Sequence, residues 1–204
     1  MTAWDQPYRR VLCMYGLVNR AVEDLVRATA GDAAWDSVKA KIGQSDLKLL
    51  DTKNYDDQLT LDLVTACSEL MDLPQADVIK AFGRHWIEYT GREGWTDLFA
   101  MTAEDFIGFI RQLDEMHERV NAAMPEGKMP QFTLQRVNEH FELVYSSARD
   151  GFAPMVMGIL EGLAEQYDEH WEFAHIGSRD ENGVDTFSMH RIVSSAALDT
   201  RDAA

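Results

Sequence analysis

The chain is poor in cysteine and in basic residues. Its 204 residues include two cysteines, Cys13 and Cys67, which are too few for a disulfide framework or a four-thiolate zinc site. The 19 basic residues are outnumbered by 35 acidic ones, and the formal charge is −16. A surface with this charge repels phosphate backbones and anionic lipid headgroups. The composition therefore argues against nucleic acids and membrane surfaces as partners.

Long apolar runs are also missing. No stretch reaches the roughly 18 to 20 consecutive apolar residues that a spanning helix needs. Charged residues from Asp5 to Arg27 interrupt the apolar core that a signal peptide would require. Together with the scarcity of cysteine, these absences predict a cytoplasmic protein. The 46% hydrophobic and 26% charged content is that of an ordinary globular chain.

The first part of the sequence has the periodicity of amphipathic helices. Apolar residues recur at spacings of three and four in five segments, which we expect to be helical: 13–28, 32–42, 56–73, 74–90 and 106–120. Gly31 is placed to end the first helix, and Asp32 and Asp56 are placed to cap the helices that follow them. The segment 102–105 has the pattern of a capping box.

The last third alternates apolar and polar residues, as antiparallel hairpins do. We expect one hairpin over 132–147 with its turn at 138–140, then a helix over 154–167, then a second hairpin over 171–192. Gly158 and Gly162 would let another segment approach this helix closely. The order predicts an α+β fold, in which a helical N-terminal subdomain packs on a C-terminal subdomain with a small antiparallel sheet and helices.

His117 stands out because it lies on the apolar face of its predicted helix. Ile110 and Leu113 precede it on that face and Val120 follows it. One interpretation is a core histidine that donates to a backbone carbonyl. The other is a neutral imidazole that binds a metal or a haem iron.

A second candidate is the short segment that carries Tyr145, Ser147 and Arg149. In an extended chain these three side chains point the same way and present two hydroxyls and a guanidinium. A guanidinium binds a carboxylate through two hydrogen bonds, so the trio suits the two propionates of a haem. The alternative is an ordinary strand end with an arginine that faces solvent.

These residues are accompanied by further motifs in a consistent order. The motifs are Met14-Tyr-Gly16, Ala81-Phe-Gly-Arg84, Leu113-Asp-Glu-Met-His117, Pro125 and Pro130, Tyr145-x-Ser147-x-Arg149, and Leu160-Glu-Gly162. With them the chain resembles the haem nitric oxide/oxygen binding (H-NOX) family, the sensor domain related to that of soluble guanylate cyclase. The resemblance predicts a single haem-binding domain over 14–192, an N-terminal extension over 1–13 and a flexible tail over 193–204.

The resemblance also assigns roles to the candidate residues. It implies haem b, an iron protoporphyrin IX, held non-covalently between the two subdomains. His117 would be the proximal iron ligand, and Tyr145, Ser147 and Arg149 would bind the propionates. Pro130 would press on the porphyrin and distort it.

The choice of gas depends on the distal side of the haem. The family's distal positions fall at Val18, Val22 and Trp86, and the tyrosine of the oxygen-binding branch is replaced by Pro154. Of these four residues only Trp86 has an N–H to donate. Bound dioxygen depends on such a donor and nitric oxide does not, so the expected ligand is nitric oxide, with CO also bound.

The resemblance further implies a non-enzymatic bacterial sensor. Nitric oxide would release His117 and shift the two subdomains, and a separate histidine kinase or cyclic-di-GMP synthase or phosphodiesterase would receive the signal. Three alternatives remain open at this point: an oxygen-binding haem sensor, a haem enzyme of the peroxidase type, and a haem-free acidic protein-interaction module.

Overall fold

A computed structural model describes residues 13–92, 103–123, 125, 128–179 and 182–192. Most of the predicted extension and the whole predicted tail lie outside these ranges. The chain separates into two compact units, one comprising Met1–Asp72 with Met124–Lys128 and the other Leu73–Ala123 with Met129–Ala204. Among the described residues, no helix has both the length and the apolarity needed to cross a membrane.

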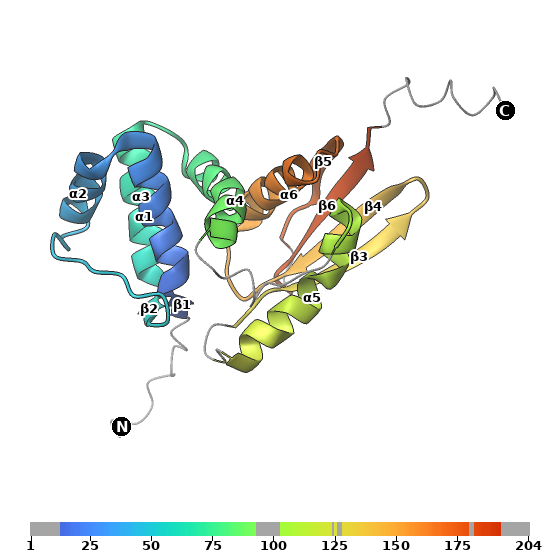
Figure 1. Cartoon of the computed structure of the whole chain (residues 1–204), viewed down its shortest axis with the longest axis horizontal. Helices are drawn as coiled ribbons and strands as arrows, with labels where there is room; N and C mark the ends of the chain where they lie inside the picture. The colour runs from blue at the N-terminus through green and yellow to red at the C-terminus, as the bar shows by residue number, and fades with distance from the viewer. Residues whose placement is uncertain (1–12, 93–102, 124, 126–127, 180–181, 193–204) are drawn as a thin grey trace, which may run out of the picture. The chain divides into compact units, whose positions relative to one another are not determined.

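The N-terminal unit is mainly helical. Its elements are β1 (Cys13–Tyr15), α1 (Gly16–Ala30), α2 (Asp32–Lys41), β2 (Asn54–Asp56) and α3 (Asp57–Met71) (Figure 1). The side chains of Trp35, Val38 and Leu63 are fully buried among these helices. The first helix was expected from residue 13, but residues 13–15 form a strand because Cys13 pairs with Asp56 and Tyr15 with Asn54.

The observed helix ends agree in part with those predicted from the sequence. Gly31 ends α1 with a φ of 83°, and the Asp56 side chain caps α3 by accepting from the Gln58 N–H at 2.9 Å. Asp32 was wrongly expected to be an N-cap: Gly31 holds that position in α2, and the Asp32 carboxylate pairs with Arg27. Thr102, the first residue of the predicted capping box at 102–105, lies outside the described residues, and the Asp105 side chain accepts from the backbone N–H of Gly108 at 2.6 Å.

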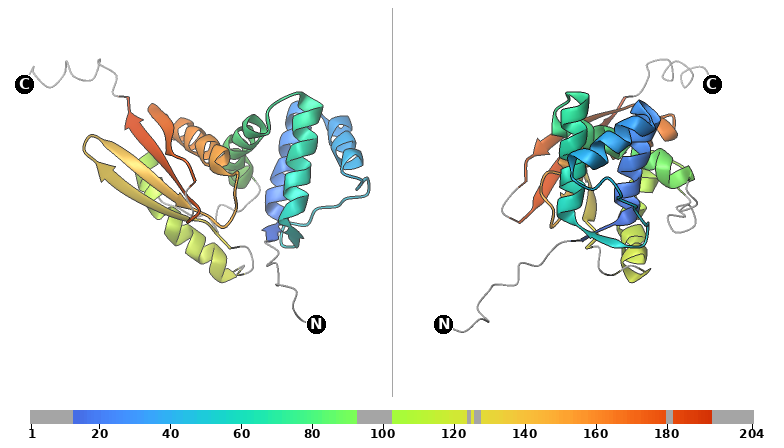
Figure 2. Two further views of the ribbon diagram at one scale, coloured as in Figure 1. Left: turned by 180° about the vertical axis from the view of Figure 1, so that it is seen from behind. Right: turned by 90° about the vertical axis from the view of Figure 1, so that its left-hand side faces the viewer.

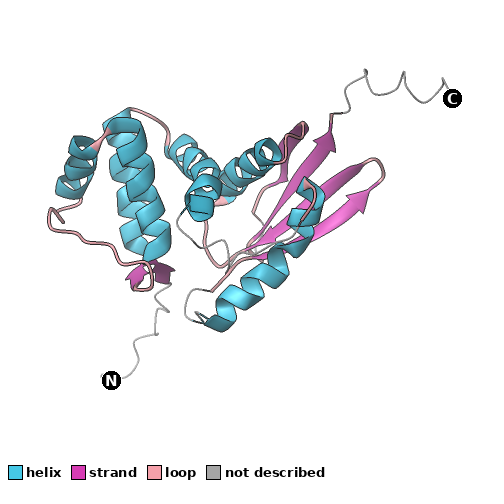
Figure 3. Ribbon diagram, in the orientation of Figure 1, coloured by secondary structure: helices cyan, strands magenta, loops and turns pink. Residues whose placement is uncertain are grey.

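The C-terminal unit combines helices with an antiparallel sheet. Its elements are α4 (Gln75–Arg92), α5 (Phe106–Ala123), β3 (Gln131–Val137), β4 (His140–Ser146), α6 (Ala153–Gln166), β5 (Trp171–Gly177) and β6 (Val184–Arg191) (Figure 3). The strand order is β3-β4-β6-β5, so the two predicted hairpins form one four-stranded sheet. The α+β prediction is confirmed, and Figure 2 shows the sheet and its helices from two further sides.

Helix α5 crosses one face of this sheet. Near its start, the Phe106 ring lies 5.0 Å from Trp171 and 5.7 Å from Phe173, both on β5. Toward its other end, the His117 ring lies 5.4 Å from Phe132 on β3. The helix therefore spans the sheet from one edge strand to the other, and it presents His117 to the β3 edge.

Helices α4 and α6 pack backbone to backbone through glycines. A Cβ atom on Gly158 would overlap with the carbonyl oxygen of Lys80, and one on Gly83 would overlap with that of Met155. The contact at Gly162 is less tight, since a Cβ there would lie 3.2 Å from the carbonyl oxygen of Arg84. The expectation of a close approach at Gly158 and Gly162 is confirmed, and the approaching segment is α4.

We expect Gly158→Ala to destabilise the protein. The new methyl group would push α4 away from α6, and overpacking of this kind costs about 1–3 kcal/mol, partly offset by the helix propensity of alanine. Urea unfolding measures the change. Gly91→Ala in α4 is the matched control, because its Cβ would meet nothing within 4 Å. Equal stability of the two variants would contradict the close contact.

Candidate functional site

The imidazole of His117 is a polar group in apolar surroundings. The ring is half-buried and stacks on Phe132 with an interplanar angle of 27°. Its Nδ1 atom is buried and has no hydrogen-bond partner among the residues that the structure describes. Buried polar atoms are nearly always paired, so this ring nitrogen is an exception among the described residues.

The protonation of His117 follows from this environment. Burial lowers its pKa from 6.5 to about 4, against the opposing effects of the Asp114 carboxylate and the Pro130 backbone carbonyl. The ring is therefore neutral at pH 7. A neutral imidazole keeps one nitrogen lone pair, which is what a metal ion requires of a histidine ligand.

The lowered pKa makes the stability of the haem-free protein depend on pH. Between pH 6.5 and about 4 the unfolded chain binds a proton that folded His117 excludes. Stability therefore falls as the pH drops through this range, by up to about 3 kcal/mol, and is fully present above it. Urea unfolding at each pH measures the effect. We expect a flatter profile for His117→Gln, and an unchanged profile would contradict the assignment.

Asp114 fixes the helix that carries His117 to the edge of the sheet. It lies one turn before His117 on α5, and its Oδ1 accepts from the backbone N–H of Phe132 at 2.6 Å. This hydrogen bond joins α5 to β3, an edge strand of the four-stranded sheet, at the point where the His117 and Phe132 rings stack. The sequence motif contains Asp114, but only the structure reveals this role.

Tyr145 is connected to His117 through the ring of Phe132. It lies on β4 directly opposite Phe132 in the strand register, and the two rings are 5.3 Å apart. Phe132 in turn stacks on His117. Two candidates that are 28 positions apart in the sequence are thus joined by one aromatic side chain, and Pro130, directly before β3, lies at the same edge with its carbonyl acting on His117.

The segment after Tyr145 differs from the sequence prediction. Strand β4 ends at Ser146, and the Arg149 backbone N–H donates to Ser147 Oγ at 3.1 Å. The segment 147–149 is therefore a turn, because the serine hydroxyl closes it, and the alternation expected of an extended chain does not apply. The alternative of a solvent-facing arginine is also wrong, since Arg149 is 9% exposed.

The three polar groups nevertheless gather at this turn. Tyr145 is 5% exposed, and its burial raises the pKa of the phenol. A hydrogen bond with Ser147 and the positive charge of Arg149 act in the opposite direction, so both lie near the phenol oxygen. A neutral phenol, a hydroxyl and a guanidinium together offer donors for carboxylates.

Two further residues support the turn and were missed by sequence reasoning. Arg179 Nη2 donates to the Ser147 carbonyl at 2.8 Å, and Nη1 donates to the Gly183 carbonyl at 3.2 Å. The buried Asp185, opposite Tyr145 in the register, pairs with His175 at 2.9 Å and lies 3.9 Å from Arg179. No local motif marks these residues, because the folded sheet brings them to the turn from positions 32 and 38 residues after Ser147.

The predicted distal residues fall in both units. Trp86 on α4 and Pro154 in the first turn of α6 belong to the C-terminal unit, and both are half-buried. The Trp86 ring contacts Phe82 with centroids 6.1 Å apart. Val18 and Val22 lie on α1 of the N-terminal unit, where Val18 is half-buried and Val22 is buried.

Comparison with known proteins shows the family of the chain. The model of the haem-NO-binding (HNOB) family matches residues 15–175, a range that contains every site residue predicted from the sequence. The chain belongs to the haem-NO-binding family. Domains of this family, also called H-NOX domains, are haem-containing gas sensors related to soluble guanylate cyclase.

The relatives agree with this membership. Soluble guanylate cyclase gcy-35 of Caenorhabditis elegans is 24% identical over 88% of this chain and 27% of its own length. For gcy-33 of the same organism the identity is 25%, over 88% of this chain and 19% of the relative. The chain thus spans about a quarter or less of the length of these curated relatives.

Solved H-NOX structures share the fold. An H-NOX protein from S. oneidensis in the Fe(II)NO state has a TM-score of 0.78 at 23% identity, over 88% of this chain and 100% of that one. An oxygen-binding H-NOX domain in its oxygen complex has a TM-score of 0.73 at 17% identity, over 86% and 93%. Both structures resemble this chain, so the fold alone does not determine whether nitric oxide or oxygen is bound.

Proposed function

We propose that this H-NOX domain binds haem b non-covalently and senses nitric oxide at the ferrous iron, with CO as a further ligand. The observation that carries the proposal is the neutral imidazole of His117, whose buried Nδ1 lacks a partner in the described part of the chain. A haem, when bound, supplies a ferrous iron with a coordination position open to a diatomic gas.

Each candidate residue has a place in this proposal. His117 would hold the iron, and its stacking on Phe132 would fix the plane of the imidazole. Tyr145, Ser147 and Arg149 would bind the two propionates from the turn after β4. Pro130 would press on the porphyrin and distort it. The charge and the donors of this turn support its proposed binding of propionates, since it presents a buried guanidinium in a chain of charge −16.

The preference for nitric oxide rests on the proposed distal residues. Val18, Val22 and Pro154 have no side-chain donor, and Trp86 has only its indole N–H. Dioxygen on ferrous iron persists when a donor stabilises the charge on its outer atom, whereas nitric oxide binds tightly without one. Trp86 is the one feature that favours the alternative of an oxygen-binding sensor.

The signal would leave the domain through His117 and α5. Release of His117 from the iron would free α5 to move, and the Asp114 bond to the Phe132 N–H would transmit that movement to β3. We propose that a separate histidine kinase or cyclic-di-GMP enzyme in the cytoplasm reads this change, and that the domain itself catalyses no reaction.

Absorption spectra of the reduced protein with and without nitric oxide test the proposal. We expect five-coordinate ferrous haem without the gas, five-coordinate nitrosyl haem with it, and no stable oxygen complex in air. A stable oxygen complex would establish the oxygen sensor instead. Colourless protein from haem-replete cells would favour the haem-free interaction module, and peroxidase turnover above that of free haemin would favour an enzyme.

A further inference from the structure

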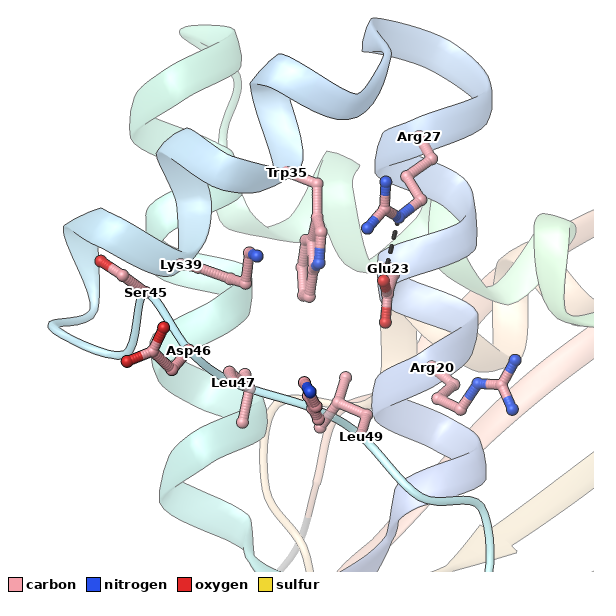
Figure 4. A pocket seen from close by; sticks show the side chains of 10 residues that line it. Arg20, Glu23, Arg27, Trp35, Lys39, Ser45, Asp46, Leu47 and Leu49 are labelled. Atoms are coloured by element: carbon pink, nitrogen blue, oxygen red, sulfur yellow. Dashed lines mark hydrogen bonds and ion pairs between the residues drawn. The ribbon is translucent and has the colours of Figure 1, made fainter.

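The N-terminal unit contains a cavity that the proposed haem function does not use. It lies between α1, α2 and the segment 45–49, and its volume is about 530 Å³ (Figure 4). Pockets for small molecules typically measure about 300–1,000 Å³. The cavity is therefore large enough for a small organic ligand, and all its lining residues belong to one compact unit.

The lining of the cavity contains more basic than acidic residues, unlike the chain as a whole. Its lining includes four basic residues, Arg20, Arg27, Lys39 and Lys48, but only two acidic ones. The whole chain has a formal charge of −16. A concentration of cations in an acidic protein focuses the potential at that point and attracts anions.

Ion pairs hold three of the cations in place. Arg20 pairs with Asp51 at 3.1 Å, Arg27 with Glu23 at 2.9 Å, and Lys39 with Asp36 at 2.9 Å. Lys48 makes no ion pair with any carboxylate in the described part of the chain. The carboxylates orient the arginines and Lys39 but also offset their charge, so Lys48 is the lining cation that no described carboxylate pairs with.

The indole of Trp35 adds a neutral donor to these charges. Trp35 is 1% exposed, yet its Nε1–H makes no hydrogen bond to any residue that the structure describes. Trp35 lines the cavity, and Figure 4 shows its ring in the middle of the lining residues. The indole nitrogen is not enclosed by protein atoms, so its N–H is open to the cavity and can donate to a ligand there.

The cavity is preformed because its covering segment is anchored at both ends. Before the cavity, the Gln44 N–H donates to the Lys39 carbonyl at 2.9 Å. After it, the Leu50 N–H donates to the Tyr55 hydroxyl at 3.0 Å, and that hydroxyl bonds to the Lys48 carbonyl at 3.2 Å. A ligand therefore does not need to order this segment when it binds.

We propose that this cavity is a binding site for a small organic anion, a carboxylate or a phosphate, held by the ammonium groups of Lys39 and Lys48 and the indole N–H of Trp35. Ammonium groups and an indole are donors only, which matches a ligand whose oxygens are all acceptors. The site would be independent of the haem, since its residues lie outside the set that binds it.

The test follows the indole N–H of Trp35 by ¹H–¹⁵N NMR, with its signal assigned from Trp35→Phe. The haem-loaded protein is titrated with citrate in one series and pyrophosphate in another, at constant ionic strength set by chloride. We expect a saturable shift of the Trp35 signal with at least one probe. Whichever probe binds more tightly identifies the ligand as carboxylate or phosphate.

Lys48→Gln provides the decisive comparison. Lys48 is exposed, and exposed charge pairs contribute little, so we expect an affinity that is weaker by about twofold to fivefold. Lys53→Gln is the matched control, because Lys53 lies over the Tyr55 ring and does not line the cavity. No saturable shift, or equal weakening by both variants, would overturn the proposal. An unchanged haem spectrum in both variants keeps this outcome separate from the haem function.

Discussion

Reduced His117→Ala protein is expected to lose the five-coordinate ferrous spectrum and to retain less than about a tenth of the wild-type haem under the same conditions. Alanine offers no lone pair to the iron, and its methyl group leaves the face of Phe132 uncovered where the imidazole stacked. Haem content per chain and the absorption spectrum after reduction measure the change.

The variant His117→Gly allows a stricter test of the same assignment. It creates space for free imidazole, which should restore the five-coordinate spectrum if the missing group is only the ligand. His190→Ala is the control, because His190 is exposed and stacks on His140 at 4.5 Å, away from the candidate site. A normal five-coordinate spectrum in His117→Ala without added imidazole would refute His117 as the ligand.

Sequence reasoning predicted those parts of the fold that depend on local patterns. Helical periodicity placed α4 and α5 to within a few residues, and alternation located the four strands of the larger sheet. The short strands β1 and β2 were missed, because three residues cannot show a period. The pairing of β4 with β6 was also beyond a local reading, since it joins Leu143 to Phe187 across α6.

The candidate site, like the fold, could be predicted from the sequence only in part. His117 and Tyr145 were identifiable from residue type, spacing and the family resemblance. Their connection through Phe132 required the register of β3 and β4. The turn after Tyr145 was wrongly predicted to be extended. A serine whose hydroxyl closes a turn cannot be distinguished by sequence from a serine on a strand. Arg179 carries no local signal and reaches the Ser147 carbonyl only in the folded sheet.

The acidic composition has a consequence for both cation-bearing sites. At a net charge of −16, an anionic ligand is repelled by the protein as a whole and must be bound by local donors. The guanidinium of Arg149 is one such local exception and the cavity with Lys48 is the other. Higher ionic strength screens the overall repulsion and also the local attraction, so the buried Arg149 should be the less salt-sensitive of the two.

Arg149→Ala is therefore expected to weaken haem binding by about tenfold to a hundredfold. A hydrogen bond to a charged group contributes about 1.5–3 kcal/mol, and the buried guanidinium is the cation of the turn that would bind the propionates. Its removal leaves Tyr145 and Ser147 as neutral donors only. The rate at which haem transfers to an excess of apomyoglobin measures the loss.

Two variants separate propionate binding from a structural role of Arg149. Arg149→Lys keeps the charge but lacks the planar pair of donors, so we expect haem loss at a rate between those of the wild type and Arg149→Ala. Arg136→Ala removes an exposed arginine from β3 and should lose haem at the wild-type rate. If the three variants lose haem equally fast while circular dichroism shows that all are folded, the turn does not bind the propionates.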